Sequence, residues 1–388
     1  MKRFDRELRA LLAFAFVNGI AESSLVPMLP SIRDDLGLSS VQVGLVLTTT
    51  TLAMLVAAIP VGYATSRFGT RGPLLFAAVL MPVGLVGQAF VGGLAALLAF
   101  RLLVGLSFGI LWTIAPARAS AEGRGAGGTG PLLAASGTGW LVGPVLGGVL
   151  ADQIGWRTAS LALAVVTVPL IPIVARSVSR GEIVRVESPR LRAAVGLLRH
   201  NRAIAGAALV SALLGVVAGV SGLLVPLSLA ANGLSAGAIG IVFGASAAVW
   251  IASAAIVGRM QASFVNLHTV GIAVAVMAVA WLLPAVRLST LALMGFLVVA
   301  TATRSTINAL NYAVGARASA GYPAPLAIGV LNLSWATTAL VSPLLAGLAD
   351  GSAGVRIAFA ATGVAAACVA ALLLLGRPRV RIEALSSS

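Results

Sequence analysis

The sequence predicts an all-α membrane protein with twelve transmembrane helices in two pseudo-symmetric six-helix bundles. Three observations support this fold class. Of the 388 residues, 59% are hydrophobic and only 10% are charged, which is far from the composition of soluble domains. Apolar runs of roughly 20 residues, the length that crosses a bilayer, recur along the chain. The second half of the chain also repeats sequence patterns of the first.

Each apolar run is long enough to be one spanning helix. In chain order the runs cover residues 8–30, 41–65, 73–92, 95–116, 129–151, 158–175, 203–230, 236–258, 267–286, 289–314, 325–349 and 355–376. A basic segment with seven arginines separates the sixth run from the seventh. We therefore predict an N-terminal bundle at 1–175, a basic linker at 176–202, and a C-terminal bundle with a short tail at 203–388.

The distribution of basic residues predicts the orientation in the membrane. If the N-terminus is cytoplasmic, 20 of the 26 Lys and Arg residues lie on that side and four on the other, with Arg101 and Arg304 inside helices. Basic loops stay cytoplasmic, so both termini and the linker are predicted to be cytoplasmic in a multi-pass cell-membrane protein. Topology and contact with anionic lipid headgroups then explain the net charge of +15, and no nucleic-acid binding is expected.

The internal repeat indicates how the two bundles are related. The segment LGLSSVQVGLVL at Leu36 matches NGLSAGAIGIVF at Asn232, an offset of 196 residues. Pro144 and Gly148 match Pro343 and Gly347 at an offset of 199. Six spans followed by six similar spans in the same sense predict two bundles around an axis along the membrane normal.

A first motif, GYATSRFGTRGPLL, begins at Gly62 after the second run. It resembles the G-x-L-A-D-R-x-G-R-R signature of the major facilitator superfamily, with Gly62, Arg67, Gly69 and Arg71 in place. The glycines permit a tight turn and the arginines hold the loop at the headgroups. Ser66 replaces the family's aspartate, which would meet the N-terminal dipole of the eleventh span, so only a neutral hydrogen bond is expected there. An ordinary basic loop is the alternative interpretation.

A second motif, GTGWLVGPVLGG at residues 137–148, matches the family's G-x-x-x-G-P-x-x-G-G pattern. The matching positions are Gly139, Gly143, Pro144, Gly147 and Gly148. Glycines four residues apart let another backbone approach closely, and Pro144 bends the helix. In the family the pattern marks antiporters, chiefly drug exporters, and this resemblance implies that the glycine face meets the eighth span and seals the outer side. A purely structural helix contact is the alternative.

Three charged residues, Glu22, Arg101 and Arg304, lie well inside predicted spans. At 1.5 Å per residue, Glu22 and Arg101 both fall about 10 Å from the outer boundary, so they share a depth at which they can pair. We predict that this pair carries proton coupling; a static ion pair is the alternative. Arg304 has no acidic residue in the C-terminal spans to neutralise it, so its expected partners are backbone carbonyls, Asn308 or Asn311, or an anionic group of a substrate. Snorkelling of its side chain to the helix end is the alternative.

Other polar and aromatic residues inside the spans are candidates to line a substrate cavity together with Arg304. They are Asn18, Gln88, Trp112, Thr113, Trp140, Trp250, Asn308, Asn311, Tyr312, Asn332 and Trp335. Ordinary helix packing is the alternative for each. The two histidines have no metal-ligand spacing and no stretch resembles a nucleotide-binding loop, so neither a metal nor another cofactor is expected.

Together these patterns predict a proton-coupled secondary transporter that exports a small amphiphilic compound or drug by alternating access. Its expected partners are a small-molecule substrate, protons and the lipid bilayer, and we expect a monomer. A sugar, amino acid or other metabolite transporter of the same fold, with or without coupling, is the alternative. A membrane enzyme would need a cluster of catalytic residues, and a membrane sensor would normally add a signalling domain.

Overall fold

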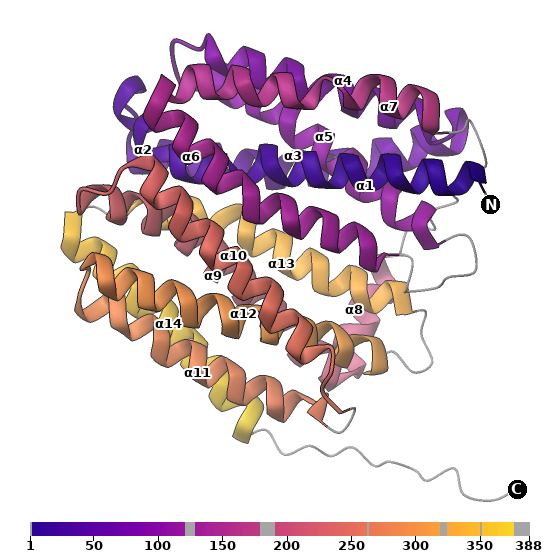
Figure 1. The fold of residues 1–388 in the computed structure, drawn as a ribbon. Helices are drawn as coiled ribbons and strands as arrows, with labels where there is room; N and C mark the ends of the chain where they lie inside the picture. The colour runs from indigo at the N-terminus through magenta and orange to yellow at the C-terminus, as the bar shows by residue number, and fades with distance from the viewer. Residues whose placement is uncertain are drawn as a thin grey trace, which may run out of the picture.

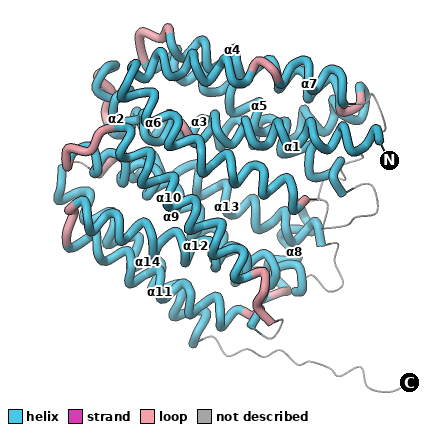
Figure 2. The backbone as a smooth tube through the Cα atoms, in the orientation of Figure 1, coloured by secondary structure: helices cyan, strands magenta, loops and turns pink. Residues whose placement is uncertain are grey.

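The computed structural model describes residues 2–120, 129–178, 191–261, 264–318, 324–349 and 351–375. In these ranges the regular secondary structure is helical throughout (Figure 2). Eleven of the described segments are long and apolar enough to cross a membrane. The prediction of an all-α, multi-pass membrane protein is therefore confirmed.

The described residues of the N-terminal half form seven helices. Their bounds are α1 (Lys2–Ser23), α2 (Leu25–Leu36), α3 (Ser40–Phe68), α4 (Arg71–Ala89), α5 (Leu94–Ser120), α6 (Gly130–Thr167) and α7 (Leu170–Ser177). The first predicted span comprises α1 and α2, which are interrupted at Ser24. Pro27 follows the interruption, and its ring nitrogen has no hydrogen to donate to a carbonyl of the preceding turn.

One apolar segment, Gly130–Ser177, is 48 residues long and covers both the fifth and the sixth predicted spans. Gly155 interrupts it with φ 77° and ψ 154°, a conformation that suits glycine because a side chain would clash there. The chain turns at this glycine, so α6 continues on the other side of it. The eleven segments therefore accommodate the twelve predicted crossings.

The C-terminal half is also helical, and it has a short helix before its spanning helices. Its helices are α8 (Leu191–His200), α9 (Arg202–Ala231), α10 (Ala236–Val257), α11 (Leu267–Val286), α12 (Thr290–Ala318), α13 (Ala324–Gly347) and α14 (Gly351–Leu375). The short helix α8 lies within the predicted linker and packs on α9 and α13. The side chain of Asn201 accepts hydrogen bonds from the N–H groups of Ala203 and Ile204, which defines the start of α9.

Helices α1 to α7 occupy the upper part of Figure 1, and the C-terminal helices lie mostly below them. Helix α6 packs on α1 within its own half and on α10 of the other half. Its counterpart in the repeat, α13, packs on α9 and on α3. The two most extensive contacts between the halves are therefore two equivalent helix pairs, α6 with α10 and α3 with α13.

Candidate functional site

Glu22 of α1 and Arg101 of α5 form a buried ion pair. The Nη2 atom of Arg101 donates to Glu22 Oε1 at 2.9 Å and to Glu22 Oε2 at 3.0 Å. It also donates to Thr50 Oγ1 of α3 at 3.0 Å. Arg101 is 1% exposed and Glu22 is 8% exposed. The pairing expected from the shared depth is thus present, and Thr50 adds a third helix that the sequence did not indicate.

A second buried carboxylate lies at the start of α1. Glu7 is 4% exposed, and its Oε1 accepts from the Nε of Arg118, near the end of α5, at 2.8 Å. The predicted first span begins at residue 8, so Glu7 was not among the charges expected inside the membrane. The two pairs lie at different levels of the same two helices, α1 and α5.

Asn18 lies one helical turn before Glu22, on the same face of α1. It is 1% exposed, and within the described residues neither its amide nitrogen nor its amide oxygen has a hydrogen-bond partner. The indole N–H of Trp112 on α5 is likewise buried without a partner there. An unpaired buried polar group costs about 1 to 3 kcal/mol, so these groups call for a partner such as a ligand or an ordered water. Asn18 therefore offers a donor and an acceptor close to the ion pair.

Three other candidates in the N-terminal half show ordinary helix contacts. Gln88 Nε2 donates to the Gly84 carbonyl at 3.3 Å, and Thr113 Oγ1 donates to the Gly109 carbonyl at 2.7 Å. Both bonds lie within the residue's own helix. Trp140 is 41% exposed and packs near Gly19 of α1. These contacts fit the packing alternative, and the structure does not join the three residues to the ion pair.

In the C-terminal half, Arg304 of α12 lies over the ring of Trp250 on α10. The centre of the guanidinium group is 4.9 Å from the ring centroid, within the range of a cation–π contact. The hydroxyl of Ser305 donates to the Trp250 carbonyl at 2.8 Å and ties the two helices together at this level. Arg304 is half-buried and makes neither a hydrogen bond nor an ion pair with the described residues. Among the described residues, neither a backbone carbonyl nor Asn308 nor Asn311 is hydrogen-bonded to it.

Asn311 faces a different helix from Arg304. Its Nδ2 donates to the Ala207 carbonyl at 3.0 Å and to Ser211 Oγ at 2.9 Å, both on α9. The expectation that Asn311 would neutralise or line a site with Arg304 is therefore wrong, because its amide fixes the packing of α12 on α9.

Arg304, Asn308 and Tyr312 follow one another at intervals of four residues and so lie on one face of α12. The hydroxyl of Tyr312 donates to Asn332 Oδ1 on α13. Trp335 lies one turn further along α13 and is half-buried. The candidates Trp250, Arg304, Asn308, Tyr312, Asn332 and Trp335 therefore come from α10, α12 and α13. The structure joins two pairs among them, Arg304 with Trp250 and Tyr312 with Asn332.

The first sequence motif spans the end of α3 and the start of α4. Gly69 ends α3 with φ 73° and ψ −179°, a positive-φ conformation that favours glycine. Gly62 instead lies inside α3 with open space around it, so the prediction that it permits a turn is wrong. Arg67 is exposed and contacts the Tyr63 hydroxyl at 3.1 Å, while Arg71 donates to the Ala175 carbonyl of α7. The side chain of Ser66 lies outside the described residues.

The glycines of the second motif face two different helices. A Cβ atom at Gly139 would lie 2.2 Å from the Phe16 carbonyl oxygen, and one at Gly143 would lie 2.6 Å from the Ile20 carbonyl oxygen. Gly147 is packed in the same way on Ser24. These three glycines therefore allow the first span to pack closely on α6. The prediction that the whole motif faces the eighth span is wrong for them.

Pro144 and Gly148 face the eighth span, α10, as predicted. A Cβ at Gly148 would lie 2.2 Å from the Ala236 carbonyl oxygen, and one at Gly240 would lie 2.2 Å from the Pro144 carbonyl oxygen. Residues of α6 advance by about 100° each. Positions 144 and 148 therefore form a stripe that is rotated from the stripe at 139, 143 and 147. Helix α6 presents three glycines to the first span, and Pro144 with Gly148 to α10.

The repeat places an equivalent contact between α3 and α13. A Cβ at Gly44 would lie 2.5 Å from the Pro343 carbonyl oxygen, and one at Gly347 would lie 2.6 Å from the Cα of Val41. The hydroxyl of Thr48 donates to the Leu340 carbonyl at 3.0 Å across the same contact. Gly44 matches Gly240 at the offset of 196 residues, so both contacts between the halves use the same repeated positions.

Asp152 strengthens the contact between α6 and α10, and the sequence alone did not single it out. Its Oδ2 accepts from the backbone N–H of Gly237 at 2.8 Å. Gly237 lies in the first turn of α10, where the unsatisfied N–H groups and the helix dipole favour a negative charge. In the sequence, Asp152 is only an acidic residue four positions after the glycine motif. Its role becomes clear only once the position of α10 is known.

The sequence matches the family model of the Major Facilitator Superfamily over residues 11–320. This match covers most of the chain, so the chain belongs to that superfamily. The superfamily is one of membrane transporters and not of enzymes.

Curated relatives match shorter stretches. The multidrug resistance protein MdtG of Yersinia enterocolitica is 32% identical over 158 residues, which is 39% of this chain and 38% of that protein. The multi-drug resistance efflux pump PmrA of Streptococcus pneumoniae is 28% identical over 152 residues, 38% of each protein. The MFS-type transporter ppzB of Metarhizium rileyi is 32% identical over 136 residues, 34% of this chain and 28% of that protein. The matches thus span about a third of the length of these relatives.

Solved structures share the fold over almost the whole chain. An inward-facing, unoccupied bacterial homologue of the human lysosomal transporter Spinster gives a TM-score of 0.78 at 16% identity, covering 96% of both chains. A POT family transporter in complex with a peptide gives 0.78 at 12% identity, covering 95% of this chain and 96% of that one. At these identities the likeness concerns the fold alone.

Proposed function

We propose that this transporter exports a small amphiphilic compound in exchange for protons, with Glu22 as the group that takes up and releases the proton. The observation that carries the proposal is the buried pair of Glu22 and Arg101, since ionisable groups inside a membrane are costly and commonly belong to proton relays. Partial similarity to MdtG and PmrA, whose names describe multidrug resistance and efflux, supports export of amphiphilic compounds.

The contacts between the halves support one state of an alternating-access cycle. The residues that pack α3 on α13 and α6 on α10 lie near the ends of these helices that are opposite to the N-terminus of the chain. With the predicted cytoplasmic N-terminus, this is the outer end. The proposed state is therefore closed on the outside. In this state Glu22 would exchange its proton with the cytoplasmic side, and substrate would enter or leave on that same side.

A two-stage experiment tests the proposal. A thermal-shift screen of the purified protein first identifies a ligand, because binding to the folded state at about 100 times Kd adds roughly 2.7 kcal/mol of stability. Transport of that ligand into liposomes with an acidic or a neutral lumen then tests the exchange for protons. The ligand is expected to accumulate above its outside concentration only in liposomes with an acidic lumen. Uptake that stops at equal inside and outside concentrations in both kinds of liposome would refute proton coupling.

A first prediction concerns the contact between Asp152 and the first turn of α10. Asp152→Asn keeps an acceptor but loses the charge, so the outer contact is expected to weaken by about 0.3 to 2 kcal/mol. Spin labels at the exposed positions Ile154 and Leu291, in a Cys368→Ala background, report the separation of the outer ends. We expect a larger population of long distances.

The matched control for this prediction is Asp35→Asn. Asp35 pairs with Arg157 within the N-terminal half, at 2.8 Å, so its loss should leave the separation of the halves unchanged. Equal distance distributions for Asp152→Asn and the unsubstituted protein would show that Asp152 does not hold the outer side closed.

A second candidate function is transport of a metabolite that carries a carboxylate or phosphate group. The position of Arg304 favours it, because this half-buried cation has no anionic partner within the described residues. Its contact with Trp250 leaves the guanidinium edge available for hydrogen bonds to a planar anion. Efflux pumps for cationic drugs would gain nothing from a positive charge at this place.

The second prediction separates these two functions. Arg304→Gln removes the charge, so an anionic ligand is expected to bind roughly 10- to 150-fold more weakly, the equivalent of about 1.5 to 3 kcal/mol for a charged hydrogen bond. A neutral or cationic ligand should bind with unchanged or higher affinity. Ligand titration by thermal shift measures both, and Arg259→Gln, which changes an exposed arginine, is the control. Unchanged affinity for every anion tested would remove Arg304 from substrate recognition.

A further inference from the structure

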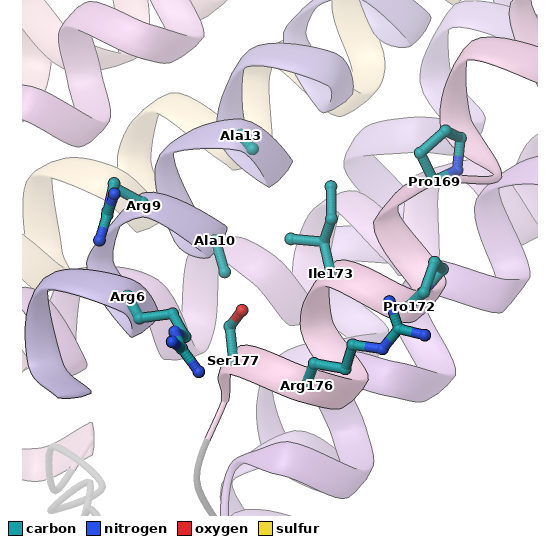
Figure 3. A pocket seen from close by; sticks show the side chains of 9 residues that line it. All are labelled: Arg6, Arg9, Ala10, Ala13, Pro169, Pro172, Ile173, Arg176 and Ser177. Carbon is teal, nitrogen blue, oxygen red and sulfur yellow. The ribbon is translucent and has the colours of Figure 1, made fainter.

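A cavity of about 660 Å³ opens between α1 and α7, outside the contacts that join the two halves. It is lined by residues from the beginning of α1 and from the segment that ends with α7 (Figure 3). The lining residues are Arg6, Arg9, Ala10, Ala13, Pro169, Pro172, Ile173, Arg176 and Ser177. Figure 3 shows Arg6 beside Ser177, and Ile173 extending into the space next to α1.

The lining changes character along the cavity. Helices α1 and α7 run in opposite directions here, so Arg6 and Arg176 mark one end while Ala13 and Pro169 mark the other. Along α1, Arg6 and Ala13 are seven residues apart, about 10 Å at 1.5 Å per residue. A charged mouth at the level of the chain's N-terminus therefore leads to an apolar inner part within the membrane-spanning segment.

The charge at the mouth is positive and not balanced by the lining, which contains no carboxylate among its described residues. Glu7, the neighbour of Arg6, is buried and accepts from Arg118 on α5 instead. The side chain of Asp5 lies outside the described residues. Arg6 and Arg176 are exposed, which places their charges where the headgroups of a bilayer begin.

We propose that this cavity binds an anionic glycerophospholipid from the membrane leaflet on the side of the N-terminus. Arg6 and Arg176 recognise the phosphate and the anionic headgroup, because arginine forms strong charge-assisted hydrogen bonds to phosphate. An acyl chain lies along Ala13 and Ile173, and Ile173 is 36% exposed in an apolar segment. A free inorganic anion would use the mouth and leave the apolar inner part without a role. The proposal does not depend on what the protein transports.

Native mass spectrometry of the purified protein with added phosphatidylglycerol or phosphatidylcholine tests the proposal. The unsubstituted protein is expected to retain phosphatidylglycerol preferentially; equal retention of the two lipids would overturn the proposal without any variant. The double variant Arg6→Gln with Arg176→Gln should bind phosphatidylglycerol about 30-fold more weakly, given the usual contribution of each arginine near an anionic headgroup. The control Arg199→Gln with Arg259→Gln removes the same charge from exposed positions elsewhere.

Two further outcomes distinguish the lipid from other occupants. Ala13→Phe fills the apolar part without changing charge, and it should also weaken retention of phosphatidylglycerol. If Ala13→Phe has no effect, or if millimolar inorganic phosphate alone displaces the lipid, the cavity is a simple anion site and the proposal is overturned. An equal loss in the control pair would show general surface attraction and overturn it as well. Unfolding midpoints of all variants are compared first, so that only folded protein is scored.

Discussion

Replacement of Glu22 by glutamine is expected to abolish gradient-driven accumulation of substrate, down to the level of liposomes without protein. Glutamine has nearly the same shape and can still accept a hydrogen bond from Arg101, but it cannot take up and release a proton. In the proposed cycle, protonation of Glu22 releases the ion pair with Arg101, and a permanently neutral side chain removes that step. Downhill exchange of substrate should persist, since it needs no proton. Both activities are measured in the same liposomes, with and without an acidic lumen.

The structure supplies a matched control for this prediction. Glu7 is also buried and also pairs with an arginine of α5, Arg118. Glu7→Gln should therefore reproduce any general cost of disrupting a carboxylate–arginine pair while leaving accumulation intact. If Glu22→Gln still concentrates substrate in the acidic lumen, Glu22 is a structural partner of Arg101 and proton coupling lies elsewhere.

Loss of stability must be separated from loss of coupling. Removing one member of a buried ion pair can cost about 3 to 5 kcal/mol, because the other charge is left without a partner. The double variant Glu22→Gln with Arg101→Gln removes both charges and is expected to unfold at a higher temperature than Glu22→Gln. It should remain uncoupled. Recovery of accumulation together with stability would show that the single variant had failed only as a folded protein.

Most of the fold was predictable because it depends on hydrophobic length. The predicted run 267–286 coincides with α11, and most other runs end within a few residues of the observed helices, whereas the first run, 8–30, is six residues short at each end of α1 and α2. Polar and glycine residues between the runs end the helices, and caps such as Asn201 define where the next begins. The interruption at Ser24 was not predicted, since it leaves the apolar run continuous.

The depth of each residue in the membrane was also predictable, and the shared depth of Glu22 and Arg101 predicted their pairing. The rotation of each helix about its own axis was not predictable. In a span that is apolar all round, the lipid-facing and buried faces have the same composition, so the helical periodicity that marks a buried face in soluble proteins is lost. Thr50 and Asn311 show the consequence: their spacing gave no sign of which helix each would contact, and one joined the ion pair while the other turned to α9.

Gly148→Leu is expected to force the two halves apart at the outer end. A Cβ at this position would already lie 2.2 Å from the Ala236 carbonyl oxygen, and a backbone cannot yield as a flexible side chain does. Overpacking of this kind costs about 1 to 3 kcal/mol. Since the closed outer contact bears that cost and the open one does not, the outward-open population should rise about 5- to 150-fold. Spin-label distances between Ile154 and Leu291 measure this change.

Gly143→Leu is the informative comparison, because the same substitution five residues earlier meets a different helix. Its side chain would collide with the Ile20 carbonyl of α1, inside the N-terminal half. Opening the outer side relieves no clash there, so we expect a lower unfolding midpoint with the distance distribution unchanged. If Gly143→Leu shifts the distances as much as Gly148→Leu, the stripe of α6 at 139, 143 and 147 and the stripe at 144 and 148 do not act separately. The separate contacts of the two stripes, one with α1 and one with α10, would then have no consequence for alternating access.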